Sequence, residues 1–255
     1  MKKMTVKNIK AICFDFGNTL ASNDALNLSG SIYAAREIFA RCRIPWDARK
    51  YSVLSQRALK KAWQRQGRIF GDVPVRLLDS QKSGEVFVET FCAELLVLCG
   101  KKPSSADVRE SAKAYYRGVA EASSLYPKTR EVLGLLRSYF NLAIVSNNPV
   151  EYVTEPVRKL GLKGLFDAVI ISGEEGPGIN KPEKSIFSAA LKKLRTRPDN
   201  TVMVGDSLTD DVAGARAAGL ISVWINRTGE KAGKGAPRPD FEIKDIGEML
   251  ELFVR

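Results

Sequence analysis

Two acidic residues, each placed directly after an apolar run, are the first candidates for chemistry in this sequence. Asp15 follows the run Ala11–Phe14, and Asp206 follows the run Thr201–Val204 and one glycine. Carboxylate oxygens are ligands that Mg²⁺ prefers, and proteins usually hold Mg²⁺ with one or two carboxylates together with phosphate and water. Asp15 and Asp206 are therefore candidate ligands of a magnesium ion that also contacts a phosphoryl group.

Other polar residues lie at comparable positions and could act on the same phosphoryl group. Ser146 follows the apolar run Leu142–Val145 and could donate a hydrogen bond to a phosphoryl oxygen. Lys181, which precedes a proline, could neutralise charge as the group transfers. Taken singly, each of these residues could instead form a turn, cap a helix or lie on the surface. Ser146 lies at the end of an apolar run and Lys181 opens the helix before the strand that leads to Asp206, and this placement favours one common site.

The composition excludes several kinds of catalytic site. The 255 residues include no histidine, which rules out a Ser-His-Asp or Cys-His site and any imidazole metal ligand. The four cysteines form no CxxC pair, so we expect neither a zinc site nor a disulfide. Carboxylates, lysines, hydroxyls and a hard metal ion remain as the available chemistry.

The elements that must position these residues form an α/β pattern. Strands are predicted at residues 10–15, 142–145, 168–171, 201–204 and 221–225. Helices are predicted between the later strands at 151–160, 183–194 and 210–218. Alternation of this kind predicts a parallel sheet, and ligands of such sheets gather at the carboxyl ends of the strands.

A long helical segment separates the first two predicted strands. They lie about 125 residues apart, far more than an ordinary crossover connection requires. Helical periodicity covers residues 32–42, 47–66, 85–98 and 106–122. We therefore predict a small helical domain inserted between the first strand and the rest of the sheet.

These segments resemble the four motifs of the haloacid dehalogenase-like (HAD) hydrolase superfamily, in order and over nearly the whole chain. The first motif, DxDxT, reads DFGNT at Asp15–Thr19, and the second is Ser146. The third is Lys181 with its proline, and the fourth, GDSxxxD, reads GDSLTDD at residues 205–211. The resemblance implies a Rossmann-like, doubly wound parallel sheet core at residues 1–22 and 123–255. It also implies an inserted all-helical C1 cap domain at residues 23–122.

The resemblance further implies a Mg²⁺-dependent phosphatase that works through an aspartyl phosphate. Asp15 would attack phosphorus, and the metal ligands would be Asp15, Asp206 and the backbone carbonyl of Gly17. Thr19, Ser146 and Lys181 would complete the catalytic group. The predicted substrate-binding residues are Phe16, Gly17, Asn18, Ser146, Asn147 and Lys181. Ser207, Asp210 and Asp211 would support the metal site, with either Asp210 or Asp211 assisting the metal's waters or Lys181.

Gly17 departs from the family pattern, which has a second aspartate at that position. That aspartate protonates the leaving oxygen and then activates water, and such acid–base catalysis typically contributes about 10² to 10⁴ in rate. Four outcomes fit: a slow phosphatase, a phosphatase that uses a cap acid such as Asp24 or Asp72, a phosphotransferase or anhydride-cleaving enzyme, and a catalytically silent or regulatory phosphate-binding relative. The haloacid dehalogenase branch also lacks this acid, but it has no use for a metal-binding Asp206.

Charge and hydropathy predict the partners. The net charge is +11, which attracts anions and suits a small phosphorylated metabolite, with Tyr33 and Trp63 as candidate specificity residues in the cap. One predicted helix carries Arg57, Lys61, Arg65 and Arg68 opposite Leu54, Ala58, Leu59, Ala62 and Trp63. We rank a solvated basic face ahead of a nucleic-acid surface because no nucleic-acid motif accompanies it. No apolar run is long enough to span a membrane, and we expect a cytoplasmic protein of open oligomeric state.

Overall fold

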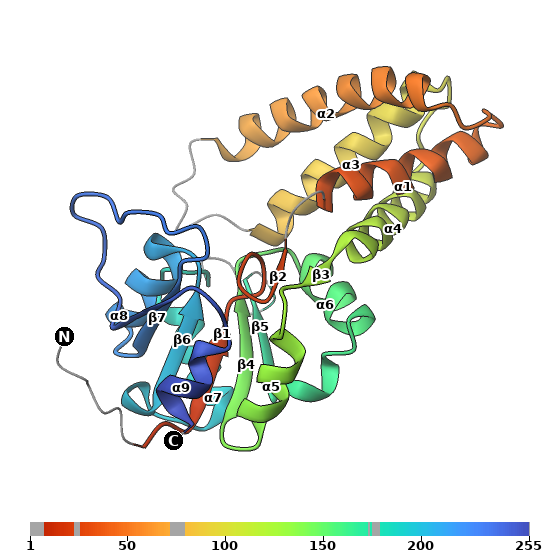
Figure 1. Ribbon diagram of the computed structural model, residues 1–255. Helices are drawn as coiled ribbons and strands as arrows, with labels where there is room; N and C mark the ends of the chain where they lie inside the picture. The colour runs from red at the N-terminus through yellow and green to blue at the C-terminus, as the bar shows by residue number, and fades with distance from the viewer. Residues whose placement is uncertain (1–7, 23–25, 72–79, 173, 175–178, 255) are drawn as a thin grey trace. The chain divides into compact units, whose positions relative to one another are not determined.

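The chain forms two compact units. The computed structural model describes residues 8–22, 26–71, 80–172, 174 and 179–254 (Figure 1). The sheet unit comprises residues 1–22, 124–148 and 160–255, and the helical unit comprises residues 23–123 and 149–159. Helix α6 (Val150–Lys159) therefore groups with the helical unit, although the sequence analysis assigned this segment to the core.

The sheet unit contains a six-stranded parallel sheet with helices on its faces, which confirms the predicted fold class. The strand order is β5-β4-β1-β6-β7-β8, and each neighbouring pair is parallel. The strands are β1 (Ala11–Phe14), β4 (Asn141–Ser146), β5 (Ala168–Ile171), β6 (Thr201–Gly205), β7 (Ile221–Ile225) and β8 (Phe241–Ile243). A separate antiparallel pair joins β2 (Ala21–Ser22) to β3 (Ser124–Leu125).

Alternating side chains of the strands face two helical layers. Ala11 and Cys13 of β1 belong to a buried cluster with Ile186 and Phe187 of α7 (Lys184–Leu194). The short helix α8 (Ala213–Ala217) lies in the same layer, and its Ala215 joins this cluster. On the other face lie α5 (Thr129–Arg137) and α9 (Glu248–Phe253), which contact each other (Figure 1). The sheet is thus covered by helices on both sides, as nearly continuous apolar strands require.

Strand β8 and the turn after β6 are among the features of the sheet unit that differ from the prediction. Strand β8 was not predicted, because its three residues include the exposed Glu242 and present no apolar run. The helix predicted at 210–218 begins instead as a π-helical turn, Leu208–Val212, and continues as α8. The wider turn places Asp211 inward, where it is 1% exposed.

The helical unit contains the four predicted helices of the insertion together with α6. They are α1 (Leu26–Arg41), α2 (Ala48–Phe70), α3 (Ser80–Leu98) and α4 (Ser105–Ala122). Asp47 caps α2 by accepting a hydrogen bond from the Lys50 amide, and Ser104 caps α4 through the Asp107 amide. Helices α1 and α4 approach closely at Gly118, where an added Cβ would lie 2.6 Å from the Ser29 carbonyl oxygen. Leu95, Phe91 and Tyr115 lie in the core of this unit.

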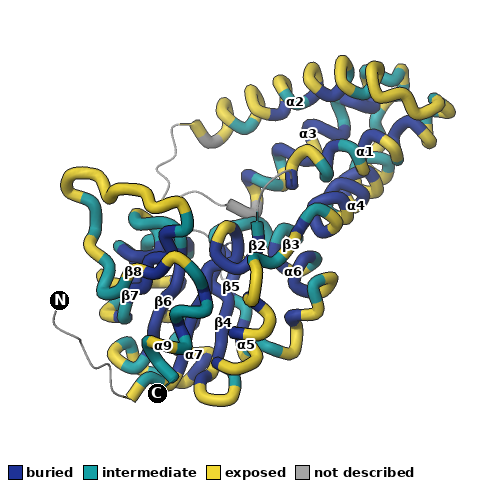
Figure 2. The backbone as a smooth tube through the Cα atoms, in the orientation of Figure 1, coloured by how far each residue is buried: buried dark blue, intermediate teal, exposed yellow. Residues whose placement is uncertain are grey.

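Helix α2 presents the predicted basic face, with one correction. Ala58 and Ala62 are fully buried, whereas Arg57 and Arg65 are exposed. Figure 2 shows exposed and buried stretches alternating along α2. Trp63, which the periodicity placed on the buried side, is 57% exposed and only rests on the ring of Phe87. The reason is its position at the margin of the apolar stripe, where a large ring can remain in solvent. The ranking of a solvated basic face ahead of a nucleic-acid surface stays a prediction.

Among the helices that the structure describes, none is both long and apolar enough to cross a membrane.

Candidate active site

Asp15 lies at the centre of the sheet, where the strand order reverses. Strand β1 has β4 on one side and β6 on the other. The strands that follow in the chain are therefore added first on one side of β1 (β4, β5) and then on the other (β6, β7, β8). The Asp15 amide donates a hydrogen bond to the Val204 carbonyl at 2.9 Å, which extends the ladder to the first residue after β1. The side chain is 7% exposed. Crevices at such switch points are the usual ligand sites of open α/β sheets.

Lys181 connects Asp15 to Asp211. Its Nζ donates hydrogen bonds to Asp15 Oδ1 and to Asp211 Oδ1, both at 2.7 Å, and the lysine itself is 2% exposed. Burial alone would lower the pKa of Lys181, but the two carboxylates outweigh it, and the pKa is raised. Lys181 is therefore a fixed cation between two acids. The structure brings Asp211, rather than Asp210, against it.

Asn147 holds the backbone of Lys181 in place. Its Nδ2 donates to the Lys181 carbonyl at 2.9 Å, and its Oδ1 accepts from the Lys181 amide at 2.8 Å. The sequence analysis predicted Asn147 as a substrate-binding residue. In this geometry its amide group is engaged with Lys181, which indicates a role in positioning the lysine.

We expect Asn147→Ala to destabilise the sheet unit by about 1–3 kcal/mol, because it leaves a peptide N–H and C=O of Lys181 without partners. Urea unfolding measures this loss. Asn141→Ala, at the exposed first residue of the preceding strand β4, is the matched control and should stay within about 0.5 kcal/mol of the parent. Equal stability of the two variants would show that the Asn147 contacts are not needed.

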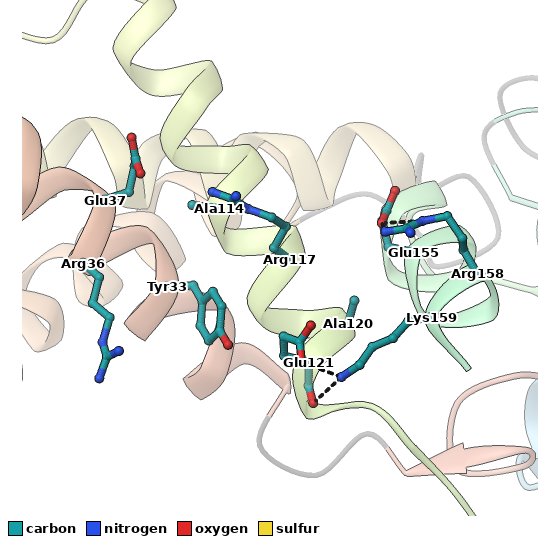
Figure 3. A pocket seen from close by; sticks show the side chains of 10 residues that line it. All are labelled: Tyr33, Arg36, Glu37, Ala114, Arg117, Ala120, Glu121, Glu155, Arg158 and Lys159. Atoms are coloured by element: carbon teal, nitrogen blue, oxygen red, sulfur yellow. Dashed lines mark hydrogen bonds and ion pairs between the residues drawn. The ribbon is translucent and has the colours of Figure 1, made fainter. Parts of the chain in front are cut away.

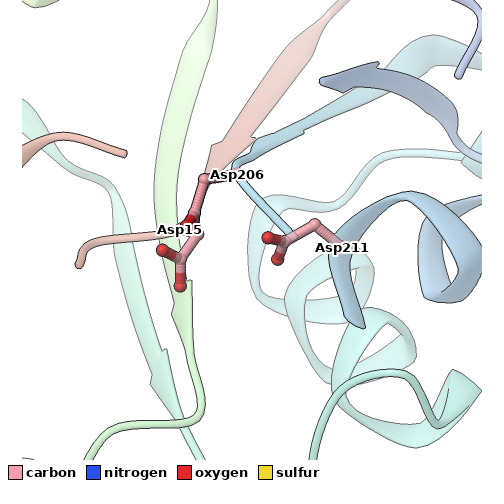
Figure 4. Close-up of side chains that lie close together, drawn as sticks. All are labelled: Asp15, Asp206 and Asp211. Atoms are coloured by element: carbon pink, nitrogen blue, oxygen red, sulfur yellow. The ribbon is translucent and has the colours of Figure 1, made fainter. Parts of the chain in front are cut away.

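Asp206 completes a cluster of three carboxylates. Asp15, Asp206 and Asp211 each offer an oxygen, and these three atoms lie within 4.8 Å of one another (Figure 4). Asp206 follows β6, and its backbone carbonyl accepts a hydrogen bond from the Trp224 indole at 2.9 Å. The Asp211 carboxylate accepts a hydrogen bond from the Ser207 amide at 3.0 Å. The acids thus converge from the ends of two adjacent strands and the turn after β6.

Gly205 allows Asp211 to reach this cluster. A Cβ added at Gly205 would lie 2.1 Å from Cγ of Asp211, far inside van der Waals contact. We therefore expect Gly205→Ala to displace Asp211, lower stability by about 1–3 kcal/mol and reduce any activity that needs Lys181 in place. Thermal unfolding provides the measurement. Gly134→Ala is the control, because nothing lies within 4 Å of its added Cβ, and an unshifted midpoint for Gly205→Ala would contradict the packing described here.

The loop Asp15–Ala21, called here the Asp15 loop, is a closed turn. The amides of Leu20 and Ala21 both donate to the Phe16 carbonyl, at 2.9 and 3.0 Å. Asn18 adopts a left-handed conformation with φ of 56°. Among the described residues with positive φ, Gly17 is not included, so its backbone does not require glycine.

Thr19 contacts the carboxylate cluster, and Ser146 is the last residue of β4. Thr19 is fully buried, and its Oγ1 donates to Asp206 Oδ1 at 3.3 Å. Ser146 is also fully buried, and its Oγ accepts from the Asn148 amide at 3.2 Å, which leaves the hydroxyl proton able to donate elsewhere. Asp210 is half-buried, and its amide donates to Ser207 Oγ at 3.1 Å. Ser207 therefore caps the turn after β6 by accepting from the Asp210 amide.

The electrostatics of the cluster leave negative charge uncompensated. Burial raises the pKa of the Asp206 carboxyl, and the neighbouring Asp15 raises it further. Burial also raises the pKa of Asp211, against the opposing effect of Lys181. Three carboxylates share the one ammonium group of Lys181, so a hard divalent cation would satisfy both the charge and the oxygen donors. The residues present thus fit Mg²⁺ at this position.

Sequence reasoning missed Arg227, which follows β7 and contacts the Asp15 loop. Its Nη1 donates to the Asn18 carbonyl at 3.0 Å, and its Nη2 donates to the Thr19 carbonyl at 2.8 Å. A basic residue two positions beyond a predicted strand was the available signal. The predicted alternative acids, Asp24 and Asp72, lie outside the described residues.

A separate groove of about 560 Å³ lies within the helical unit, between α1, α4 and α6 (Figure 3). Tyr33, one of the predicted specificity residues, lines it. Two of its cations are matched by acids: Lys159 pairs with Glu121 and Arg158 with Glu155, both at 2.7 Å. This near-balance of charge gives the groove little preference for anions.

Comparison with known proteins identifies the family. A family model described as haloacid dehalogenase-like hydrolase matches residues 9–219, which is most of the chain. The chain belongs to this family of hydrolases. The resemblance drawn from the four motifs is thereby confirmed.

Three relatives that are similar in sequence are named as phosphatases. The HAD chain is 34% identical over 165 residues to phosphoserine phosphatase of Thermus thermophilus, covering 64% of each protein. It is 29% identical over 250 residues to glyceraldehyde 3-phosphate phosphatase of Methanopyrus kandleri, covering 96% of this chain and 97% of that protein. It is 32% identical to human N-acylneuraminate-9-phosphatase, but over only 52% of that protein's length.

Solved structures share the fold. A 2-haloacid dehalogenase from Pseudomonas syringae superimposes with a TM-score of 0.72 and 22% identity, covering 97% of this chain and 99% of that one. A HAD phosphatase from Thermococcus onnurineus gives a TM-score of 0.62 and 24% identity, covering 96% and 97%. At these identities the likeness establishes the HAD fold and leaves the choice between phosphatase and dehalogenase to the site.

Proposed function

We propose that this HAD protein is a Mg²⁺-dependent phosphatase that uses Asp15 as a covalent nucleophile. The observation that carries the proposal is the arrangement of Lys181, which lies 2.7 Å from both Asp15 and Asp211, with Asp206 in the same carboxylate cluster. Lys181 is buried and hydrogen-bonded to the candidate nucleophile Asp15, and Asp15 and Asp206 would together hold a divalent cation. This arrangement of positive charge is suited to a dianionic phosphoryl group.

Asp15, Asp206 and the Gly17 carbonyl would hold the metal ion, with Asp211, Asp210 and Ser207 in supporting positions. When bound there, Mg²⁺ would supply positive charge to offset the carboxylates and the phosphoryl oxygens. Phe16, Asn18, Ser146 and Lys181 remain the proposed residues for binding the phosphoryl group.

The proposed reaction has two steps. A carboxylate oxygen of Asp15 attacks phosphorus, the bond from phosphorus to the leaving oxygen breaks, and the leaving alcohol takes a proton from water because residue 17 has no carboxyl group. Water then attacks phosphorus of the aspartyl phosphate, the bond to Asp15 breaks, and inorganic phosphate leaves. Ser146 would donate its hydroxyl proton to a phosphoryl oxygen, and Lys181 would keep Asp15 oriented and stabilise the developing charge.

The substrate class follows from the relatives and the charge. The named relatives act on phosphoserine, glyceraldehyde 3-phosphate and an N-acylneuraminate 9-phosphate, which are all small phosphomonoesters. The net charge of +11 favours anionic substrates of this kind in general. We propose a small phosphorylated metabolite, with the helical insertion at residues 23–122 as the substrate-selecting cap and residues 1–22 and 123–255 as the catalytic core of a cytoplasmic enzyme.

Two alternatives remain in view. A silent phosphate-binding relative is favoured by Gly17, but it would not need the Asp15–Lys181 contact at 2.7 Å. A haloacid dehalogenase is favoured by several fold neighbours, but its reaction makes no use of the carboxylate cluster that includes Asp206.

The test is phosphate release from p-nitrophenyl phosphate and from a panel of phosphorylated metabolites, with Mg²⁺ and with EDTA. The proposal predicts metal-dependent release. Chloride release from 2-chloropropionate without metal would favour the dehalogenase. No turnover of any of these substrates by folded, Mg²⁺-treated protein would favour the silent relative.

A further inference from the structure

We propose that Arg227 is a positioning residue that holds the Asp15 loop in place through hydrogen bonds to its backbone carbonyls. This inference rests on the proposed function of that loop. Arg227 lies beyond β7, and its two guanidinium donors bind the consecutive carbonyls of Asn18 and Thr19 at 3.0 and 2.8 Å. A single side chain therefore binds the loop at the two residues that follow Gly17.

Tyr126 completes the attachment on the other side. The guanidinium carbon of Arg227 lies 3.8 Å from the centre of the Tyr126 ring, in a cation–π contact. The Tyr126 amide donates to the Leu20 carbonyl at 3.1 Å. Three successive carbonyls of the Asp15 loop, those of Asn18, Thr19 and Leu20, are thus bound by groups that come from elsewhere in the sheet unit.

The attachment reaches the carboxylate cluster through Thr19. The carbonyl of Thr19 is held by Arg227, and its hydroxyl donates to Asp206 at 3.3 Å. Loss of Arg227 would free the Thr19 backbone and with it the hydrogen bond to Asp206. Among the described residues, Arg227 forms no hydrogen bond or ion pair with the three clustered acids, so its hydrogen bonds affect the cluster through the loop.

Gly17 makes such an attachment important in this chain. Glycine has more backbone freedom than any other residue, so a loop with glycine beside the nucleophile loses more conformational entropy when it is ordered. The Gly17 carbonyl is also a proposed metal ligand, which must be held within a fraction of an ångström to be useful. The bidentate guanidinium, stacked on Tyr126, supplies a rigid attachment that a lysine ammonium could not reproduce.

The experiment compares wild type with Arg227→Ala and Arg227→Lys by two readouts. The first is hydrogen exchange of the peptide covering residues 16–21, against that of the β1 strand. The second is steady-state kinetics with p-nitrophenyl phosphate over a range of Mg²⁺ concentrations. Arg197→Ala is the matched control, because the Arg197 side chain is 80% exposed and pairs only with Asp199 among the described residues.

We expect both Arg227 variants to speed exchange in the Asp15 loop while β1 stays protected. We also expect kcat to fall by about 10- to 100-fold and the Mg²⁺ concentration for half-activation to rise by a similar factor, with little change in KM for the phosphate ester. The kcat effect distinguishes positioning of the loop from direct contact with substrate.

Several outcomes would overturn the inference. Unchanged exchange in the loop, equal acceleration in β1, or a raised KM with kcat intact would each contradict a positioning role. If Arg227→Ala fails to fold, Arg227→Lys, which keeps the charge, decides the question. An inactive wild type would contradict the proposed function instead, and loop exchange would still test the attachment by itself.

Discussion

Asp15→Asn is expected to reduce metal-dependent phosphate release by at least about 10³-fold while the protein stays folded. The amide has almost the shape of the carboxylate but is a far weaker nucleophile and a poorer metal ligand. Lys181 keeps Asp211 as a partner at 2.7 Å, so the buried ammonium is not left without a counter-charge. Phosphate release and circular dichroism on the same preparation provide the measurement.

The matched control for this change is Asp199→Asn. Asp199 is 64% exposed in its side chain and pairs with Arg197 at 3.1 Å, away from the carboxylate cluster. It should keep wild-type turnover. Activity that persists in Asp15→Asn at more than a tenth of the wild-type rate would show that another residue carries the reaction.

Gly17→Asp is expected to raise turnover of substrates with poor leaving groups by about 10- to 1,000-fold. The new carboxyl group would supply the acid that protonates the leaving oxygen and the base that activates water, a contribution of about 10² to 10⁴ when optimally placed. The φ angle of Gly17 does not oppose a side chain, because Gly17 is not among the described residues with positive φ. The gain in kcat/KM, which reports only the steps up to the aspartyl phosphate, should be much smaller with p-nitrophenyl phosphate, because its leaving group needs no proton.

Gly17→Ala and Gly17→Asn serve as controls for this prediction, since both add a side chain without an acid. The ratio of kcat/KM for an alkyl phosphate to kcat/KM for p-nitrophenyl phosphate should change only in the aspartate variant. An unchanged ratio in Gly17→Asp would indicate that the wild type already has an acid from elsewhere, such as Asp24 or Asp72.

The parallel sheet could be read from the sequence because its strands are buried on both faces. The strands Ala168–Ile171 and Ile221–Ile225 were predicted with the bounds that the structure has. A continuous apolar run marks where a strand buried on both faces begins and ends. Strand β8 escaped because an edge strand needs no such run. Trp63 was misplaced because helical periodicity gives the direction of a side chain but not the width of the surface that covers it.

Only part of the site could be read from the sequence, because some of its residues belong to no local motif. Asp15, Lys181 and Asp206 carry motifs, and the structure brings them together at the ends of β1 and β6 and beside β4. The choice of Asp211 over Asp210 depends on the π-helical turn, which no local pattern predicts. Arg227 acts through backbone carbonyls about 210 residues away in the chain, and such contacts leave no trace in local spacing.

Trapping the phosphoenzyme tests the central claim most directly. The wild type would be mixed with substrate and Mg²⁺, quenched in acid, digested and examined by mass spectrometry for a phosphoryl group on the peptide that contains Asp15. Because Gly17 cannot activate water, the second step should be slow, and the account predicts that the modified peptide accumulates during turnover and disappears when substrate is exhausted. Turnover without any modified peptide, or a phosphoryl group on a different residue, would contradict it.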